Sequence, residues 1–194
     1  DGRGTHLGQF NTGDHILALF KDGTYYTTTF DLSNRYQGDL LKIEKLDSNK
    51  VYTVLYYDKA VAAFYVKRFS FDVSDNTPVS FISDAKGSYL VAISDDKHPQ
   101  IEVIFGGKNE HREPELIDAE EFIAKKGLQA KGKKTSQYDV KKVQFIEPLH
   151  KPEDDILPIS SEAENQAGEI ENYEPTDSEP FDLTIDDDPQ LTLF

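Results

Sequence analysis

Short apolar runs rich in β-branched and aromatic residues recur along the first 146 residues, and polar turns separate them. Runs of this kind, bounded by Asp, Gly and Pro, are typical of β-strands joined in hairpins. The pattern predicts three hairpins, formed by residues 16–20 with 24–30, residues 51–57 with 60–69, and residues 89–94 with 100–105. It predicts further strands at residues 40–46, 79–82 and 140–146.

The turns of the three predicted hairpins contain Asp22, Asp58 and Asp95, which lie 36 and then 37 positions apart. A period of this length is typical of architectures that repeat one small sheet around an axis. A β-sandwich would also have frequent turns, so strand number leaves both folds open and the period favours repeated sheets. One short helix is predicted at residues 118–126, although this segment could also be the end of a strand. The predicted fold class is therefore all-β, built from repeated small antiparallel sheets.

Charge divides the chain into two parts. All 21 Lys and Arg residues lie at or before Lys151, whereas residues 152–194 contain 14 Asp or Glu and no base. Residues 1–150 are therefore nearly neutral, long enough to bury a core, and able to bind a polyanion through one basic face. Residues 151–194 are rich in Glu, Asp, Pro and Ser and have no apolar period, so we predict a disordered acidic tail.

The composition also excludes several kinds of site. The absence of cysteine removes disulfides, thiolate metal sites and thiol nucleophiles. The histidines are scattered without the spacing of metal ligands, and no nucleophile motif or distinctive carboxylate pair is present. We therefore expect no catalytic residue, metal or cofactor in this chain. No run approaches the roughly 20 apolar residues of a membrane helix, which indicates a soluble protein without a membrane partner. The absence of cysteine is compatible with a reducing cytosol.

Residues 125–142, KKGLQAKGKKTSQYDVKK, contain seven lysines and a single acidic residue, Asp139. We call this stretch the basic segment. Lysines at this density suit phosphate groups, because each neutralised phosphate releases a counterion. Gly127 and Gly132 would let the backbone approach a ligand closely. The alternative interpretation is a solvated loop.

Other cations could extend a basic surface, namely Arg35, Arg112 and the neighbours Lys67 and Arg68. Adjacent residues of a strand point to opposite faces, so at most one of Lys67 and Arg68 is expected to join such a surface.

Five stretches together resemble the C-terminal region of the A subunit of bacterial topoisomerase IV: GRGTHLGQFNTGDHILALFKDGTYYTTTFDLSN, FYVKRFSF, IEVIFGG, REPELID and EFIAKKGLQAKGKKTSQYDVKK. The resemblance spans nearly all of residues 2–146. In that family the domain is a β-pinwheel, a propeller-like disc of sheet blades whose basic rim binds duplex DNA. Because the family has more blades than residues 1–150 can supply, the resemblance implies a partial pinwheel. We expect the missing blades upstream of Asp1, where the chain starts without methionine.

The resemblance also implies a function. The related protein in gyrase wraps DNA with the help of a box rich in Gln, Arg and Gly. The nearest segment here, residues 127–134, lacks the paired arginines and paired glycines. Capture and positioning of DNA for relaxation or decatenation is therefore expected, rather than wrapping. The expected DNA-binding residues are the lysines of the basic segment: Lys125, Lys126, Lys131, Lys133, Lys134, Lys141 and Lys142.

The resemblance puts the chemistry of the enzyme outside this chain. The DNA-cleaving tyrosine is expected in an earlier part of the A subunit. ATP hydrolysis, with Mg²⁺, is expected in other domains, including the ATPase B subunit. Both subunits are thus expected partners, and the expected location is the cytoplasm, at the nucleoid.

The last five residues, QLTLF, resemble the peptide by which bacterial proteins bind the replication sliding clamp. The expected clamp contacts are Gln190, Leu191, Leu193 and Phe194. An exposed apolar peptide on an acidic tether suits a groove on a partner, and an unbound end is the alternative. Residues 152–189 are expected to compete with DNA for the basic face, unless the tail serves solubility alone.

The sequence as a whole predicts a non-catalytic, DNA-binding domain that positions DNA for a topoisomerase IV-like enzyme. The rival hypothesis is a protein-interaction propeller with an acidic docking tail. Exposed lysines along an outer edge would favour DNA, whereas an exposed apolar patch would favour a protein partner.

Overall fold

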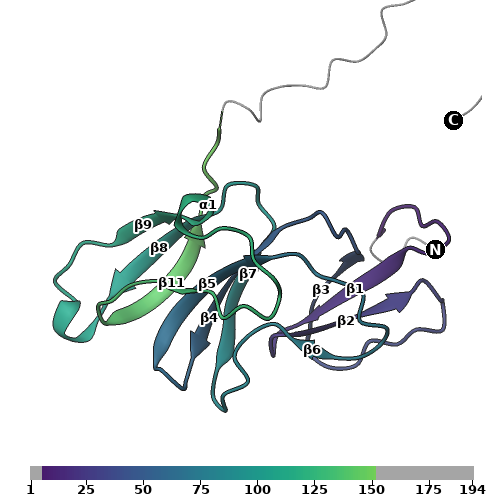
Figure 1. Ribbon diagram of the computed structural model, residues 1–194, viewed down its shortest axis with the longest axis horizontal. Helices are drawn as coiled ribbons and strands as arrows, with labels where there is room; N and C mark the ends of the chain where they lie inside the picture. Colours follow the sequence, from purple (N-terminus) through teal and green to yellow (C-terminus); the bar gives the residue numbers. More distant parts are fainter. Residues whose placement is uncertain (1–5, 152–194) are drawn as a thin grey trace, which may run out of the picture. The chain divides into compact units, whose positions relative to one another are not determined.

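The computed structural model describes residues 6–151, and three antiparallel sheets account for most of them (Figure 1). Sheet A consists of β1 (His15–Phe20), β2 (Thr24–Thr29), β3 (Leu40–Lys45) and β6 (Val79–Ser80), in the order β3-β1-β2-β6. Sheet B consists of β4 (Tyr52–Asp58), β5 (Ala63–Phe69), β7 (Tyr89–Ser94) and β10 (Lys133–Lys134), in the order β10-β5-β4-β7. Sheet C consists of β8 (Gln100–Phe105), β9 (Glu115–Asp118) and β11 (Val140–Ile146), in the order β11-β8-β9.

Helix is almost absent from the described residues, as predicted. The 3₁₀ turn η1 (Gly107–Asn109) and the single-turn helix α1 (Ala119–Phe122) are its two elements there. The Asp118 carboxylate caps α1 by accepting from the backbone N–H groups of Glu120 and Glu121, at 2.8 and 3.4 Å. The helix predicted to reach residue 126 ends four residues earlier, because Ile123 is buried in an extended conformation.

The first two predicted hairpins are confirmed. β1 pairs with β2 and β4 pairs with β5. In the first turn, Gly23 takes a φ of +82° and the Asp22 carboxylate accepts from the backbone N–H of Thr24 at 2.9 Å. Local turn chemistry therefore determines this hairpin.

The third predicted hairpin is wrong. Residues 89–94 and 100–105 do form strands, but β7 pairs with β4 in sheet B, whereas β8 pairs with β9 and β11 in sheet C. Asp95 thus lies in a connection between two sheets, and its spacing from Asp58 does not mark an equivalent hairpin turn. The prediction failed because a short polar link between two strands does not reveal whether the strands pair with each other.

The two four-stranded sheets each receive their last strand from later in the chain. β6 lies in the connection between β5 and β7, yet it pairs with β2 of sheet A. In the same way β10 lies between β9 and β11, yet it pairs with β5 of sheet B. Sheets A and B are therefore each completed by a short strand that lies, in sequence, among the strands of the next sheet. The pairing of β10 with β5 places the basic segment against sheet B.

Sheet B lies between the other two sheets and is buried on both faces (Figure 1). Phe64 and Val66 of β5 pack with the core of sheet C, whereas Phe69 packs with that of sheet A. Alternate residues of a strand point to opposite faces, so a sheet with two covered faces needs apolar residues at nearly every position. This explains the almost continuous apolar runs of β4 and β5.

An aromatic cluster fills the space between sheets A and B. Phe71 is fully buried at its centre, with ring centres 4.6 Å from Tyr25, 4.8 Å from Tyr52, 5.0 Å from Phe69 and 5.4 Å from Phe81. Tilted and edge-on rings at such distances add to the free energy gained by burying their area.

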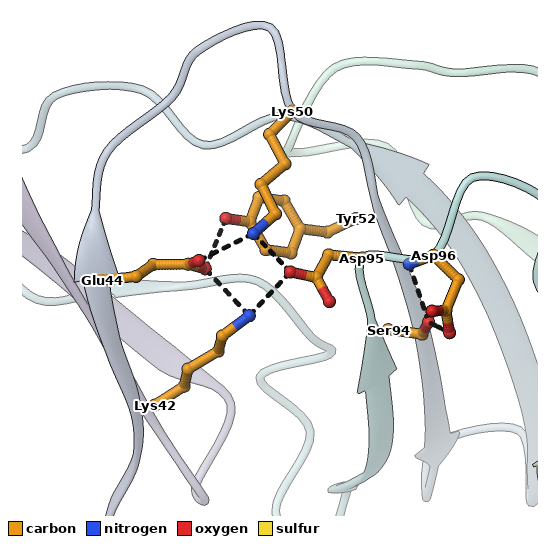
Figure 2. A network of polar contacts seen from close by, with 7 residues as sticks. All are labelled: Lys42, Glu44, Lys50, Tyr52, Ser94, Asp95 and Asp96. Atoms are coloured by element: carbon orange, nitrogen blue, oxygen red, sulfur yellow. Dashed lines mark hydrogen bonds and ion pairs between the residues drawn. The ribbon is translucent and has the colours of Figure 1, made fainter. Parts of the chain in front are cut away.

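A network of charged side chains also joins sheets A and B (Figure 2). Lys42 and Glu44 lie on β3, and Lys50 precedes β4, which contains Tyr52. The Lys42 Nζ lies 2.7 Å from Asp95 and 3.3 Å from Glu44, and the Lys50 Nζ lies 2.7 Å from Glu44 and also contacts Asp95. The Tyr52 hydroxyl donates to Glu44 at 2.7 Å. Two cations and two carboxylates thus alternate across the junction.

The network shifts the pKa values of its members. Partial burial opposes the ionisation of Asp95, but hydrogen bonds from Lys42 and Lys50 outweigh it and lower the pKa of Asp95 to about 2. Burial likewise opposes ionisation of Glu44, and hydrogen bonds from Lys50 and Tyr52 outweigh it and lower that pKa as well. Both carboxylates therefore stay ionised in mildly acidic solution.

We predict that Asp95→Asn lowers the free energy of unfolding by roughly 1 kcal/mol at neutral pH. This value allows for solvent screening, because one-third of the Asp95 side chain is exposed. The folded pKa of Asp95 lies below its unfolded value of about 3.9, so its contribution is present above that pH. The contribution is then lost as the pH falls to about 2. Urea unfolding at several pH values measures this.

The matched control is Asp96→Asn, because the Asp96 side chain accepts from Ser94 and takes no part in the network. Equal losses of stability in the two variants would contradict the assignment of the inter-sheet contribution to Asp95.

Candidate nucleic-acid interface

The basic segment is attached by its main chain to the edge of β5 that β4 leaves free. The backbone N–H of Lys126 donates to the Arg68 carbonyl at 2.8 Å, and that of Thr135 donates to the Phe64 carbonyl at 3.0 Å. Between these points Lys133 pairs with Val66 and Lys134 with Tyr65. The segment therefore runs antiparallel to β5 along the edge of sheet B.

Residues 127–132 leave this edge and pass over the side chains of sheet B. The Tyr56 hydroxyl donates to the Lys131 carbonyl at 2.6 Å, and the Lys67 Nζ donates to the Leu128 carbonyl at 2.7 Å. Leu128 packs against the core between sheets A and B. Two polar groups from the sheet thus hold the carbonyls of this loop.

Gly132 returns the segment to β5. Its φ is +91°, and a Cβ added there would lie 2.4 Å from the Val66 carbonyl oxygen. The glycine is therefore required by the approach of two protein backbones, not by the approach of a ligand, which was the role expected from the sequence. Gly127 has open space around it and no positive φ.

The second group of lysines lies on β11, the outer strand of sheet C. The register of β11 with β8 shifts between Val140 and Lys142, which leaves Lys141 as the extra residue of a β-bulge. Val140 and Val143 both pack against the core, and the two lysines between them are exposed. Gly106 makes room for the bulge, since a Cβ added there would lie 2.8 Å from the Lys141 Cβ.

All seven lysines of the basic segment are exposed, but two are engaged by protein groups. The Lys131 Nζ lies 2.9 Å from the buried Asp58 carboxylate, and its hydrogen bond lowers the pKa of Asp58. The Lys133 Nζ donates to the Phe122 carbonyl at 3.2 Å and lies 3.8 Å from the centre of the Phe122 ring.

The other five lysines have no side-chain hydrogen bond or ion pair within residues 6–151. They are Lys125, Lys126, Lys134, Lys141 and Lys142. Lys134 is on β10, the outer strand of sheet B, and Lys141 and Lys142 are on β11, the outer strand of sheet C. A short loop, residues 135–139, connects the two strands. These side chains can meet phosphate groups without first breaking an ion pair in this part of the molecule.

The additional cations suggested by the sequence have mostly other roles. Lys67 and Arg68 are both buried, so neither joins an exposed basic surface. The Arg35 guanidinium donates to three carbonyls of its own loop, at 2.9, 3.1 and 3.2 Å. Arg112 remains available: its guanidinium lies 3.9 Å from the centre of the Tyr138 ring, within the basic segment.

The aromatic residue that supports Arg112 was not found by sequence reasoning. Tyr138 lies in the short link between β10 and β11, and no local pattern relates it to a residue 26 positions earlier. The expected clamp-binding residues Gln190, Leu191, Leu193 and Phe194, and the acidic tail from residue 152, lie outside the described residues. Within residues 6–151 no three His, Cys, Asp or Glu side chains are grouped to hold a metal.

A family model described as the topoisomerase C-terminal domain of Bacteroidota matches residues 1–147. The chain belongs to this topoisomerase C-terminal domain family. The match covers all three sheets and ends after β11, so the basic segment is part of the family's domain. No curated protein and no solved structure matches the chain. In this topoisomerase C-terminal domain, no helix of residues 6–151 is long and apolar enough to cross a membrane.

We predict that Gly132→Ala destabilises the domain by about 1–3 kcal/mol, because the new Cβ would clash with Val66 and the φ is strained for alanine. Gly127→Ala is the matched control and should change stability by less than about 0.5 kcal/mol, since nothing lies within 4 Å of its added Cβ. Urea unfolding distinguishes the two. Equal stabilities would show that the basic segment is not held against β5.

Proposed function

We propose that this domain binds duplex DNA through the exposed lysines of the basic segment and positions it for a type IIA topoisomerase. The observation that carries the proposal is the set of five exposed lysines without an ion-pair partner among residues 6–151. Three of them, Lys134, Lys141 and Lys142, lie on the outer strands of sheets B and C. Membership of a topoisomerase domain family supports DNA, rather than another polyanion, as the ligand.

The chemistry of the lysines suits recognition of shape and charge. An ammonium group contacts phosphate as a point charge, whereas bidentate reading of a guanine edge typically uses arginine. Arg112, which lies against the Tyr138 ring, is a single arginine among many lysines in this part of the surface. The expected binding is therefore independent of DNA sequence and strongly dependent on salt.

The proposal extends to the enzyme of which this domain is part. The likeness of the sequence to the A subunit of topoisomerase IV supports a C-terminal domain of that protein, with its sheets arranged as part of a β-pinwheel. DNA cleavage by a tyrosine would then occur in an earlier part of the same protein, and ATP hydrolysis with Mg²⁺ would involve the B subunit. The expected activity of the whole enzyme is relaxation or decatenation of DNA in the cytoplasm.

The rival hypothesis of a protein-interaction propeller is less well supported. The large apolar side chains exposed in residues 6–151 come from separate segments, and Leu32, in the loop after β2, is fully exposed. Phe30 and Leu32 belong to one segment, whereas Leu116 lies on a different strand, β9. Exposed apolar residues in small numbers are normal on a soluble domain.

We predict that Lys141→Gln with Lys142→Gln weakens binding of duplex DNA and lowers the slope of log affinity against log salt. Each lost phosphate contact should lower the slope by about 0.9, so the double variant should lose up to ~1.8. Fluorescence anisotropy at several salt concentrations measures it. The control pair is Lys21→Gln with Lys97→Gln, exposed lysines of the β1–β2 turn and the β7–β8 link. A wild-type slope in the first pair would exclude β11 from the interface.

We also propose that the C-terminal peptide QLTLF binds the replication sliding clamp and brings the topoisomerase to replication forks. A synthetic peptide of the last twelve residues should bind purified clamp with micromolar affinity, because Leu193 and Phe194 supply apolar anchors for a groove. Changing both residues to alanine should abolish binding in a calorimetric titration. If the unchanged peptide does not bind, the proposed partner is wrong.

A further inference from the structure

Lys67 is a lysine in the interior of the domain. It lies on β5, the strand along which the basic segment runs, and only 5% of its surface is exposed. Its Nζ donates to the Leu128 carbonyl at 2.7 Å and lies 5.0 Å from the centre of the Phe69 ring. Within residues 6–151 no carboxylate lies within ion-pair distance of this ammonium group.

Lys67 lines a pocket of about 200 Å³ that residues 128–131 of the loop also line. The charged groups that face this pocket are Asp58 from β4, Asp84 from the link between β6 and β7, and Lys131 from the loop itself. Asp58 is already engaged by Lys131 at 2.9 Å and by the backbone N–H of Ala60 at 2.9 Å. The fixed partner of Lys67 is therefore a backbone carbonyl of the basic segment.

The ammonium group of Lys67 does not stabilise the folded domain. Burial lowers the pKa of Lys67 to about 8, whereas the unfolded value is about 10.4. The folded state thus favours the neutral amine, so the protonated form weakens folding at neutral pH. Stability should rise as the pH increases from about 8 to about 10.4. A neutral side chain of similar size would avoid this penalty.

We propose that Lys67 is a proton-linked positioning residue of the DNA interface: its ammonium group holds the loop of residues 127–132 through Leu128 and adds positive charge directly behind it, so that DNA is bound preferentially when Lys67 is protonated. The proposal rests on the proposed function. It adds a buried group to the exposed lysines, and it makes DNA binding depend on pH through that group.

The dependence follows from linkage between the two equilibria. DNA phosphates near the loop favour the protonated form of Lys67, and protonation in turn strengthens DNA binding by the same factor. If DNA raises the pKa of Lys67 by one unit, affinity falls about tenfold between neutral pH and a pH above both values. At a pH near 8, binding should take up protons from the buffer.

The test is calorimetric titration of the full chain with a short duplex DNA near pH 8, in Tris and in HEPES, which differ in ionisation enthalpy. Protons that the protein takes up on binding come from the buffer, so the observed enthalpy of the wild-type protein should differ between Tris and HEPES. This difference should be larger for the wild-type protein than for Lys67→Met. Lys67→Met should lose this difference, bind DNA more weakly at neutral pH, and melt at a higher temperature than the wild-type protein at pH 7. Proton uptake by other groups is common to both proteins, so the comparison with wild type isolates Lys67.

Lys21→Met, which removes an exposed charge in the β1–β2 turn, is the control and should keep the wild-type proton uptake. Equal proton uptake and equal affinity in Lys67→Met and wild type would overturn the linkage while leaving DNA binding intact. A lower melting temperature in Lys67→Met would also contradict the proposal, because the ammonium group would then be stabilising. Failure of the wild-type protein to bind DNA at low salt would instead refute the proposed function, and the linkage with it.

Discussion

The pairing of the basic segment with the free edge of β5 determines where the lysines lie. Hydrogen bonds from the backbone N–H groups of Lys126 and Thr135 fix the two ends of the contact, and β10 pairs with β5 between them. An open strand edge is otherwise a site for unwanted pairing with other chains. The same hydrogen bonds that protect the edge of sheet B thus hold a run of lysines along it, and the short link to β11 brings two more lysines to the edge of sheet C.

Charge has opposite roles at two places beside sheet B. At the junction with sheet A, Lys42 and Lys50 alternate with Glu44 and Asp95, so each cation has a carboxylate partner and the charges stabilise the contact between sheets. Under the loop of residues 127–132, the buried Lys67 has a carbonyl as its partner. Paired charges are consistent with a structural role, whereas a buried charge without a carboxylate is typical of a functional one.

The parts of the fold that local chemistry determines could be predicted from the sequence. The hairpin at Asp22 and Gly23, most of the strands and the exposure of the lysines of the basic segment follow from turn residues, apolar runs and charge density. The short strands β9 and β10 were not predicted, because neither is an apolar run bounded by turns. The pairing of β7 and β8 could not be predicted, because both strands are bounded by similar turns and their partners lie far away in sequence. The sequence does indicate the bulge at Lys141. Val140 and Val143 both face the core although they are three positions apart, whereas side chains on one face of a regular strand are two positions apart.

Burial of Lys67 had no signal in the sequence. The segment YVKRF has a charged pair between apolar residues, and a sheet with one solvated face would have exposed one of the two cations. Both faces of sheet B are covered, by sheet A and by sheet C with α1, so Lys67 and Arg68 are both buried. This outcome depends on tertiary packing and on the return of the basic segment over β5.

The central claim is that duplex DNA contacts the lysines of the outer strands of sheets B and C. Lysine acetylation of the full chain, with and without duplex DNA, tests it directly when the modified sites are identified by mass spectrometry. The account predicts that DNA protects Lys134, Lys141 and Lys142, while the exposed Lys21 on sheet A reacts equally in both samples. Equal reactivity of Lys134, Lys141 and Lys142 with and without bound DNA would contradict it.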